Sequence, residues 1–103
     1  MKNEYDYEDD LALEEEIELK PPSMYKVIFH NDDYTSMEFV VFVLREIFHK
    51  SEIDSNKIML EVHVKGTGIV GIYTHEVATT NVYLVEKLAE EYEYPFRASI
   101  EPV

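Results

Sequence analysis

The pattern of apolar and polar positions predicts a strand followed by a helix at the start of the globular part of the chain. From Met24 to His30 apolar side chains alternate in part with others, which is typical of a half-buried strand. A polar turn over residues 31–34 follows it. Thr35 is then expected to be the N-cap of a helix, because Glu38 three residues later completes a capping box. Apolar residues at helical spacing predict this helix over about 37–49: Phe39, Val40, Val43, Leu44, Ile47 and Phe48.

The rest of the pattern predicts two more helices and two more strands. The expected elements are a helix over about 52–64, a strand over 69–73, a helix over about 75–92 and a strand over 96–100. Gly66 and Gly68 should end the first of these helices, and Thr74 should cap the second. The resulting βααβαβ order predicts an α+β fold, in which a small three-stranded antiparallel sheet packs against three helices.

The N-terminal segment differs in composition from the rest of the chain. The formal net charge is −13, and the first 20 residues hold nine acidic and two basic side chains, which gives −7. Their few apolar residues are too sparse to offset the entropy of ordering. We therefore expect a flexible, disordered acidic extension over residues 1–22 and a globular domain over residues 23–103. Composition alone leaves open whether the extension only aids solubility or is offered to another protein.

Composition also excludes several classes of protein. The chain has no cysteine, which excludes a disulfide scaffold, a thiolate metal site and a cysteine nucleophile. Its negative charge disfavours nucleic acid as a partner. No apolar run approaches the roughly 20 residues of a membrane span, and the charged start does not fit a signal peptide. We expect a cytoplasmic protein, monomeric, with no cofactor and no metal.

The four histidines do not by themselves indicate catalysis or metal binding. His30, His49 and His75 lie at the ends of predicted elements, where ordinary surface roles are expected, and none of the four has a metal-binding spacing to another. A small hydrolase that uses His63 with Asp32 or Asp33 is one alternative, but it would lack an identifiable nucleophile and oxyanion donors.

Three polar residues become informative only in combination. Taken singly, the Asn31–Asp32 pair favours local capping of the turn, and His63 on the rim of an apolar helix face favours a structural histidine. Together, an amide oxygen, a carboxylate and an imidazole nitrogen can accept the three N–H groups of an ammonium ion. Met37 and Met59 would add a deformable apolar wall. This combination fits a free α-amino group with a bulky side chain beside it.

The motifs that contain these residues resemble those of the ClpS family, the adaptors that deliver N-end-rule substrates to the Clp AAA+ ATP-dependent protease. The resemblance extends over about residues 21–103. It rests on three separated motifs in the same order: Asn31-Asp32-Asp33-Tyr34-Thr35-x-Met37-Glu38-Phe39-Val40, Met59-x-x-Val62-His63, and Gly71-x-Tyr73-Thr74-x-Glu76-Val77-Ala78.

The resemblance implies a role for each matching residue. Asn31, Asp32 and His63 would bind the substrate's α-amino group. The pocket for the first side chain (Leu, Phe, Tyr or Trp) would be formed by Thr35, Met37, Val40, Met59, Val62 and Phe96. Met37 would exclude β-branched residues. Glu76 would dock on the N-terminal domain of a Clp unfoldase, and the acidic extension would enter the unfoldase during hand-over of N-degron proteins. The chain would be an adaptor and not an enzyme.

Three positions depart from the family's usual pattern. Phe96 stands where Leu is common, which predicts a narrower pocket that binds Trp less well than Leu or Phe. Asn81 stands where a docking Lys is frequent, so that part of the unfoldase interface is in question. Ser36 replaces a frequent Pro and changes the rigidity of the turn. The alternative function is a ribosomal-protein-like protein–protein interaction module, which would not need Asn31, Asp32 and His63 together.

Overall fold

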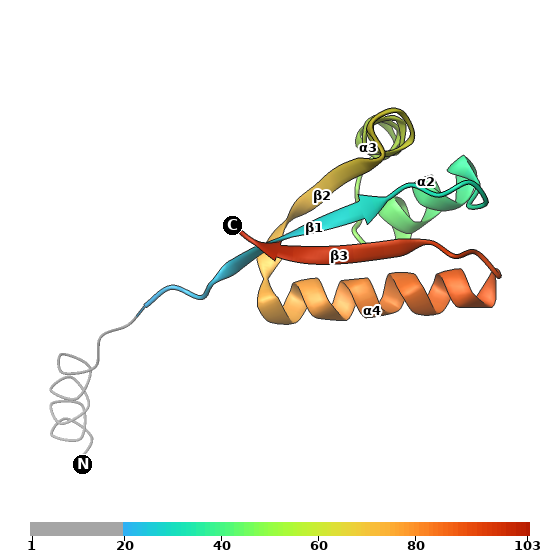
Figure 1. The fold of residues 1–103 in the computed structure, drawn as a ribbon. Helices are drawn as coiled ribbons and strands as arrows, with labels where there is room; N and C mark the ends of the chain where they lie inside the picture. Colours follow the sequence, from blue (N-terminus) through green and yellow to red (C-terminus); the bar gives the residue numbers. More distant parts are fainter. Residues whose placement is uncertain (1–19) are drawn as a thin grey trace, which may run out of the picture.

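The structure is a computed structural model that describes residues 20–103, and it confirms the predicted α+β fold (Figure 1). The elements follow one another in the predicted βααβαβ order. The three strands form one antiparallel sheet with β1 in the middle, in the order β2-β1-β3. The bounds of the elements are β1 Met24–His30, α2 Met37–Glu46, α3 Glu52–Lys65, β2 Thr67–Thr74, α4 His75–Glu91 and β3 Arg97–Pro102. The predicted acidic extension lies, up to residue 19, outside the described residues.

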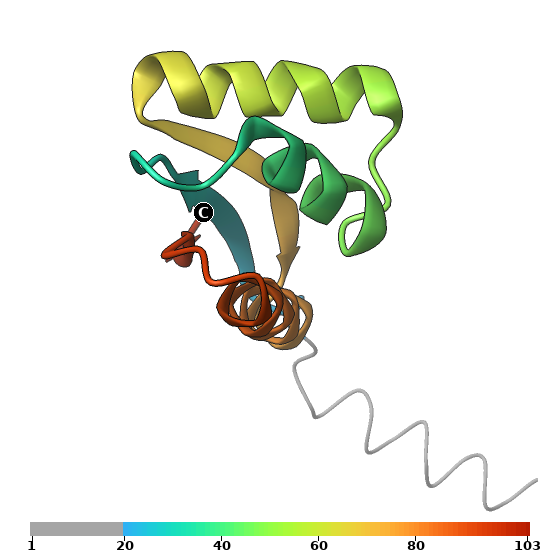
Figure 2. The same ribbon diagram turned by 90° about the vertical axis from the view of Figure 1, so that its right-hand side faces the viewer.

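The helices lie in two directions relative to the sheet. Figure 1 shows α4 running along the strands, whereas Figure 2 shows α3 running across them at the other end of the molecule, with α2 beside it. The loop between β1 and α2 therefore lies next to α3, far from the start of β1. This arrangement brings residues 31–37 and the end of α3 together.

The hydrophobic core of the described residues lies between the sheet and the helices. Val27 and Phe29 on the central strand are completely buried. They pack with residues from all three helices and from the other strands: Phe39, Val40, Val43, Leu44, Phe48, Val62, Val70, Ala78, Val85, Ala89, Phe96 and Ala98. Fully burying a large apolar side chain contributes about 1.5–3 kcal/mol to folding. Because Val40, Val43 and Leu44 anchor α2 in this core, the outward position of Met37 at its start is set as well.

The N-cap of α2 is Ser36, so the prediction of a Thr35 cap with a capping box was wrong. The Ser36 Oγ accepts a hydrogen bond from the backbone N–H of Phe39 at 3.1 Å. The Thr35 hydroxyl instead donates to the Asp32 carboxylate at 2.7 Å. Both residues are good caps, and the carboxylate three residues before Thr35 decides between them.

The other helix ends agree more closely with expectation. Gly66 ends α3 with a left-handed backbone (φ 90°), and its N–H donates to the Val62 carbonyl. The Thr74 hydroxyl caps α4 by accepting a hydrogen bond from the Val77 N–H. In contrast, α2 ends at Glu46, three residues before the predicted end. The Ile47 and Phe48 side chains still pack on the core from the turn that follows, which explains why they continue the helical pattern.

Candidate functional site

The loop from Asn31 to Ser36 is held in shape by the Asp32 carboxylate. Its Oδ1 accepts hydrogen bonds from the backbone N–H groups of Tyr34 (2.8 Å) and Thr35 (2.7 Å). Its Oδ2 accepts one from the Thr35 hydroxyl. A carboxylate has about four acceptor sites, so about one remains on Oδ2 for a donor from outside the loop. Asp32 is thus both the organiser of the loop and a remaining acceptor.

The charge of Asp32 is maintained by the same bonds. Partial burial raises the pKa of this carboxyl, but the hydrogen bonds from the Thr35 hydroxyl and from the Thr35 and Tyr34 backbone outweigh it and hold the pKa below its usual value. Asp32 is therefore ionised at neutral pH. An ionised carboxylate with a remaining lone pair is suited to binding a cation.

A backbone hydrogen bond ties the loop to the end of α3. The Asn31 N–H donates to the Gly66 carbonyl at 2.9 Å. His63 lies on the last turn of α3, one turn before Gly66. The left-handed turn at Gly66 therefore places Asn31 beside the helix end that carries His63. Gly68, at the start of β2, is required for a different reason, because a Cβ there would lie 2.7 Å from Cγ2 of Val62.

The loop, the start of α2 and the end of α3 enclose a hollow of about 450 Å³. This is within the range of about 300–1,000 Å³ that is typical of ligand sites. The lining residues come from these three segments only: Asn31, Asp32, Asp33, Tyr34, Thr35, Ser36, Met37, Glu38, Val40, Met59, Val62 and His63. The structure thus brings together the three predicted α-amino-binding residues and five of the predicted pocket residues.

The hollow has both apolar and polar lining residues. Met37, Val40, Met59 and Val62 supply apolar walls, while Asn31, Asp32 and His63 supply acceptors. Three carboxylates line it and none of the lining residues is Lys or Arg. Such a lining favours a ligand with a positive charge at one end and an apolar group at the other. It fits the ammonium-binding site expected from the sequence.

Phe96, the sixth predicted pocket residue, is buried in the hydrophobic core. It is 2% exposed and packs edge-to-face against Phe29 and Phe39 in the core, at ring distances of 4.9 and 6.2 Å. It is not among the residues that line the hollow. The expectations that Phe96 narrows the pocket and that Trp binds less well than Leu or Phe therefore stay predictions.

The two predicted docking residues lie on another part of the molecule. Glu76 is exposed in the first turn of α4, and Asn81 is partly exposed on the same helix. α4 packs against the strands, whereas the hollow is formed by α2, α3 and the loop between β1 and α2. Docking through α4 would therefore leave the hollow accessible.

The sequence interpretation missed four lining residues, namely Asp33, Tyr34, Ser36 and Glu38. All four are neighbours of predicted site residues in the segment between β1 and the first turn of α2. A loop that turns around a single carboxylate presents most of its side chains to the same space, and this was the available signal. Of the remaining histidines, His30 lies with Nε2 at 2.7 Å from the Ser99 Oγ, across the β1–β3 pair.

Two further findings concern the described part of the chain. Within residues 20–103, no three or more His, Asp or Glu side chains are grouped so that they could hold a metal ion. In the same range no helix combines the length and the apolar character needed to cross a membrane.

Comparison with known proteins gives consistent results over this region. The profile of the family described as "ATP-dependent Clp protease adaptor protein ClpS" matches residues 20–99. The adapter protein ClpS of Myxococcus xanthus is 55% identical over 84 residues, which are 82% of this chain and 78% of that one. The ClpS of Syntrophus aciditrophicus is 44% identical, with both chains covered completely.

A solved structure shows the same fold. The structure of Agrobacterium tumefaciens ClpS2 bound to L-phenylalaninamide superimposes with a TM-score of 0.78 and 34% sequence identity, and the match covers 81% of this chain and all of the other. From the profile match, the relatives and the fold, it follows that this chain belongs to the ClpS family of ATP-dependent Clp protease adaptor proteins.

Proposed function

We propose that the hollow binds the free α-amino group and the bulky hydrophobic first residue of N-degron proteins (Leu, Phe, Tyr or Trp), and that the chain delivers these proteins to a Clp AAA+ unfoldase for ATP-dependent degradation. The observation that carries the proposal is the lining of the hollow, in which Asn31, Asp32 and His63 lie with four apolar side chains. The proposal describes a cytoplasmic, monomeric adaptor without a cofactor.

The polar residues match the donors of an α-ammonium group. This group has three N–H donors and one positive charge. The Asn31 amide oxygen, the remaining lone pair on Asp32 Oδ2 and a His63 ring nitrogen would each accept one of them. A hydrogen bond to a charged group contributes about 1.5–3 kcal/mol. Three such bonds would provide a large part of the affinity.

The same residues would reject internal or acetylated residues. An acetylated amine has no charge and one N–H, so Asp32 would be desolvated by the ligand without receiving a cation in return. Leaving a buried polar group unpaired costs more than a missing contact. Selectivity for free chain ends follows from this difference.

The apolar walls match a bulky first side chain. Val40 and Val62 are buried at the base of the hollow, whereas Met37 is 45% exposed at its edge. Burying a Leu or Phe side chain contributes about 1.5–3 kcal/mol. The charged hydrogen bonds and the buried side chain together, less the free-energy costs of association, are consistent with a dissociation constant in the micromolar to submicromolar range.

The ligand of the related structure supports this assignment. L-phenylalaninamide, to which Agrobacterium tumefaciens ClpS2 is bound, has a free α-amino group and a bulky aromatic side chain, and its carboxyl group is replaced by an amide. It therefore mimics the first residue of a protein chain. The proposal extends the same ligand class to this chain, whose hollow has matching chemistry.

Delivery requires a second surface and the acidic extension. We assign docking on the unfoldase N-terminal domain to α4, which carries Glu76 and Asn81. The extension over residues 1–22 would then act in hand-over of the substrate, as a segment separate from the binding domain over residues 23–103.

The proposal is tested by measuring the affinity of dye-labelled peptides that start with Leu or Phe. The free-ended peptides should bind, and their N-acetylated counterparts should bind at least about 100-fold more weakly, because about 3 kcal/mol or more of charged hydrogen bonding is lost. Binding that does not depend on the free amine would contradict the proposal and would favour a general protein interaction module.

The residue-level test is Asp32→Ala, which should abolish binding of the Leu peptide while the circular dichroism spectrum remains that of a folded protein. Asp54→Ala is the matched control, because Asp54 is an exposed acid in the first turn of α3 that does not line the hollow. It makes the same change in net charge and should leave the affinity within about twofold.

A further inference from the structure

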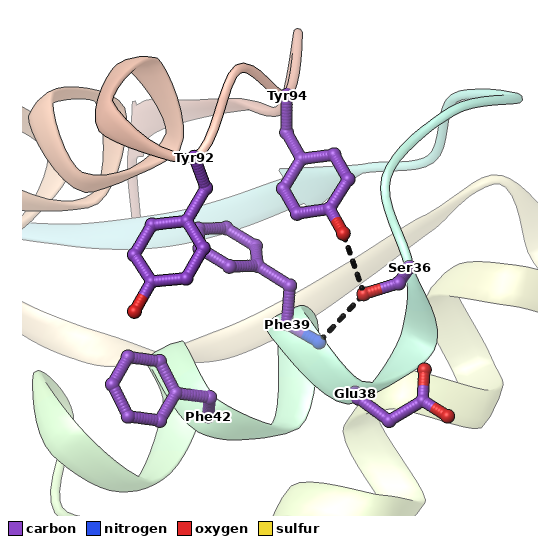
Figure 3. Close-up of a pocket in the computed structure, with 6 residues that line it drawn as sticks. All are labelled: Ser36, Glu38, Phe39, Phe42, Tyr92 and Tyr94. Atoms are coloured by element: carbon purple, nitrogen blue, oxygen red, sulfur yellow. Dashed lines mark hydrogen bonds between the residues drawn. The ribbon is translucent and has the colours of Figure 1, made fainter.

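The start of α2 is held by a residue that is distant in sequence and does not line the hollow. The Tyr94 hydroxyl donates to the Ser36 Oγ at 3.2 Å, and the same oxygen accepts the Phe39 N–H at 3.1 Å (Figure 3). Ser36 is the N-cap of α2. A side chain that follows the last helix therefore fixes the cap of the first.

The position of the Tyr94 hydroxyl is set by the core and not by the loop. The Tyr94 ring packs against the buried Phe39 ring at a centroid distance of 5.0 Å, and the Tyr92 ring packs on Phe39 at 5.3 Å. These residues surround a groove of about 250 Å³, separate from the substrate hollow, that is lined by Ser36, Glu38, Phe39, Phe42, Tyr92 and Tyr94 (Figure 3). The Tyr94 hydroxyl therefore holds Ser36 at a position that is set by the packing of the Tyr94 ring on the core.

Ser36 connects this groove with the substrate hollow, because it lines both. Its carbonyl also accepts the Val40 N–H at 3.3 Å. The next residue, Met37, and Val40 one turn later are walls of the hollow. Since Val40 is anchored in the core whereas Met37 is 45% exposed, a shift of Ser36 would move the Met37 wall relative to Val40 and Asp32.

We propose that Tyr94 is a positioning residue for first-residue specificity, because its hydrogen bond to Ser36 holds the first turn of α2 and the Met37 wall in place. This inference rests on the proposed function. A β-branched first side chain, such as Ile or Val, has its extra bulk next to the α-amino group, close to the wall. Only a wall that cannot retreat distinguishes it from Leu.

The backbone of Ser36 explains why such a bond is useful here. Its φ is −73°, within the range that a proline ring would impose, about −65 ± 15°. Ser has no such ring, and the hydroxyl pair of Ser36 and Tyr94 supplies an equivalent restraint.

The test is Tyr94→Phe, which removes the hydroxyl and keeps the ring that packs on Phe39. Affinities are measured for free-ended peptides that start with Leu, Ile or Val. The Leu affinity should stay within about threefold, while the ratio of Leu to Ile affinity should fall about two- to tenfold, the effect of one lost hydrogen bond. Tyr92→Phe is the matched control, because Tyr92 lies in the same aromatic group and its hydroxyl makes no hydrogen bond within residues 20–103. It should leave the ratio unchanged.

Ser36→Pro, alone and combined with Tyr94→Phe, separates the effect of the Tyr94 hydrogen bond from that of the packing of its ring. Ser36→Pro removes the acceptor and restrains φ by its ring, so Tyr94→Phe should have no further effect on the ratio in that background. Amide hydrogen exchange gives a readout that needs no peptide, and the Phe39 N–H should exchange at least about threefold faster in Tyr94→Phe than in the unmodified chain.

Several outcomes would overturn the inference. These are an unchanged ratio and exchange rate in Tyr94→Phe, an equal loss of affinity for Leu and Ile, or the same change of the ratio in the Ser36→Pro background. Failure of the proposed function would look different. The unmodified chain would then bind no free-ended peptide, whereas failure of the positioning role alone leaves Leu binding intact and appears only between variants.

Discussion

Asp32 combines a structural task with the binding task proposed for it, because its two oxygens have different surroundings. In the described part of the chain, Oδ1 accepts two backbone N–H groups, while Oδ2 accepts only the Thr35 hydroxyl. Local capping of the turn and recognition of a cation are therefore compatible in one side chain. Asp32→Asn separates them, since an amide oxygen retains the backbone bonds but the charge is lost. This variant should keep the loop and lose most of the peptide affinity.

The lowered pKa of Asp32 determines how pH acts on the loop. Because the folded-state pKa lies below the unfolded value, the ionised carboxyl stabilises the fold at pH values above the ordinary Asp range near 4. This contribution is lost as the pH falls through the lower, folded-state pKa. Between pH 5 and 8 Asp32 stays ionised, so any pH dependence of binding in that window must come from another group.

We expect a protonated His63 to weaken binding of a Leu-initiated peptide several-fold, which is measured by comparing the affinity at neutral pH with that in mild acid. Histidine is the side chain that ordinarily gains a proton in mild acid, and an imidazolium can neither accept an N–H nor tolerate an adjacent ammonium. The peptide's α-amino group is charged under both conditions, since its usual pKa is near 8.

The other titratable groups that line the hollow are the carboxylates Asp32, Asp33 and Glu38. In His63→Gln the pH dependence should disappear. An affinity that stays flat or rises in acid for the unmodified chain would contradict the assigned role of His63.

At the scale of elements, α3 contains two serines that should respond oppositely to the same substitution. Ser55 is completely buried and its hydroxyl has no hydrogen-bond partner among residues 20–103, so Ser55→Ala should leave the free energy of unfolding unchanged or raise it by up to about 1 kcal/mol. Ser51 is the N-cap of α3 and accepts the Asp54 N–H, so Ser51→Ala should lower it by about 0.5–2 kcal/mol. Urea unfolding measures both, and a loss at Ser55 as large as that at Ser51 would indicate an unseen partner.

The turn after α3 should be the most sensitive backbone position of the site. Gly66 has φ 90°, and a Cβ there would meet no atom within 4 Å, so Gly66→Ala measures backbone strain alone. It should cost about 1–2 kcal/mol in free energy of unfolding. Since the Gly66 carbonyl accepts the Asn31 N–H, peptide affinity should fall as well. Stability equal to the unmodified chain would show that the turn relaxes without strain.

The elements could be predicted from the sequence because their apolar periods are regular, and β1 has the predicted bounds. The predictions of the N-cap and of the end of α2 were wrong because they depend on contacts between residues from different parts of the fold. Thr35 and Ser36 are equally good caps, and only the contact with Asp32 distinguishes them. Ile47 and Phe48 continue the helical spacing although they lie beyond α2. The residues around the hollow were predictable because they belong to short motifs, whereas the packing depth of Phe96, just before β3, is not revealed by any local pattern.

At the scale of the whole molecule, we expect removal of residues 1–20 to separate binding from delivery. The truncated chain should bind the Leu peptide with affinity within about twofold, because no residue of the hollow is removed. It should no longer support degradation of a Leu-initiated substrate by the unfoldase and its protease. Both are measured with the same labelled substrate, by anisotropy and by loss of the intact band.

A chain in which residues 1–20 are replaced by a Gly/Ser segment of equal length is the control for length. If this chain supports degradation, the length of the extension is sufficient for hand-over. If it does not, the acidic sequence itself is required. Continued degradation without any extension would contradict its proposed role in hand-over.

The C-terminal residue lies beside the start of β1, whereas the loop that lines the hollow follows the other end of that strand. The Val103 N–H donates to the Met24 carbonyl at 3.0 Å, and the seven residues of β1 then separate Met24 from Asn31, a distance of about 20 Å along an extended strand. A fluorophore or surface tether attached after Val103 would therefore leave the opening for the ligand clear. Occupancy of the hollow and engagement by the protease can in this way be followed independently on one immobilised molecule.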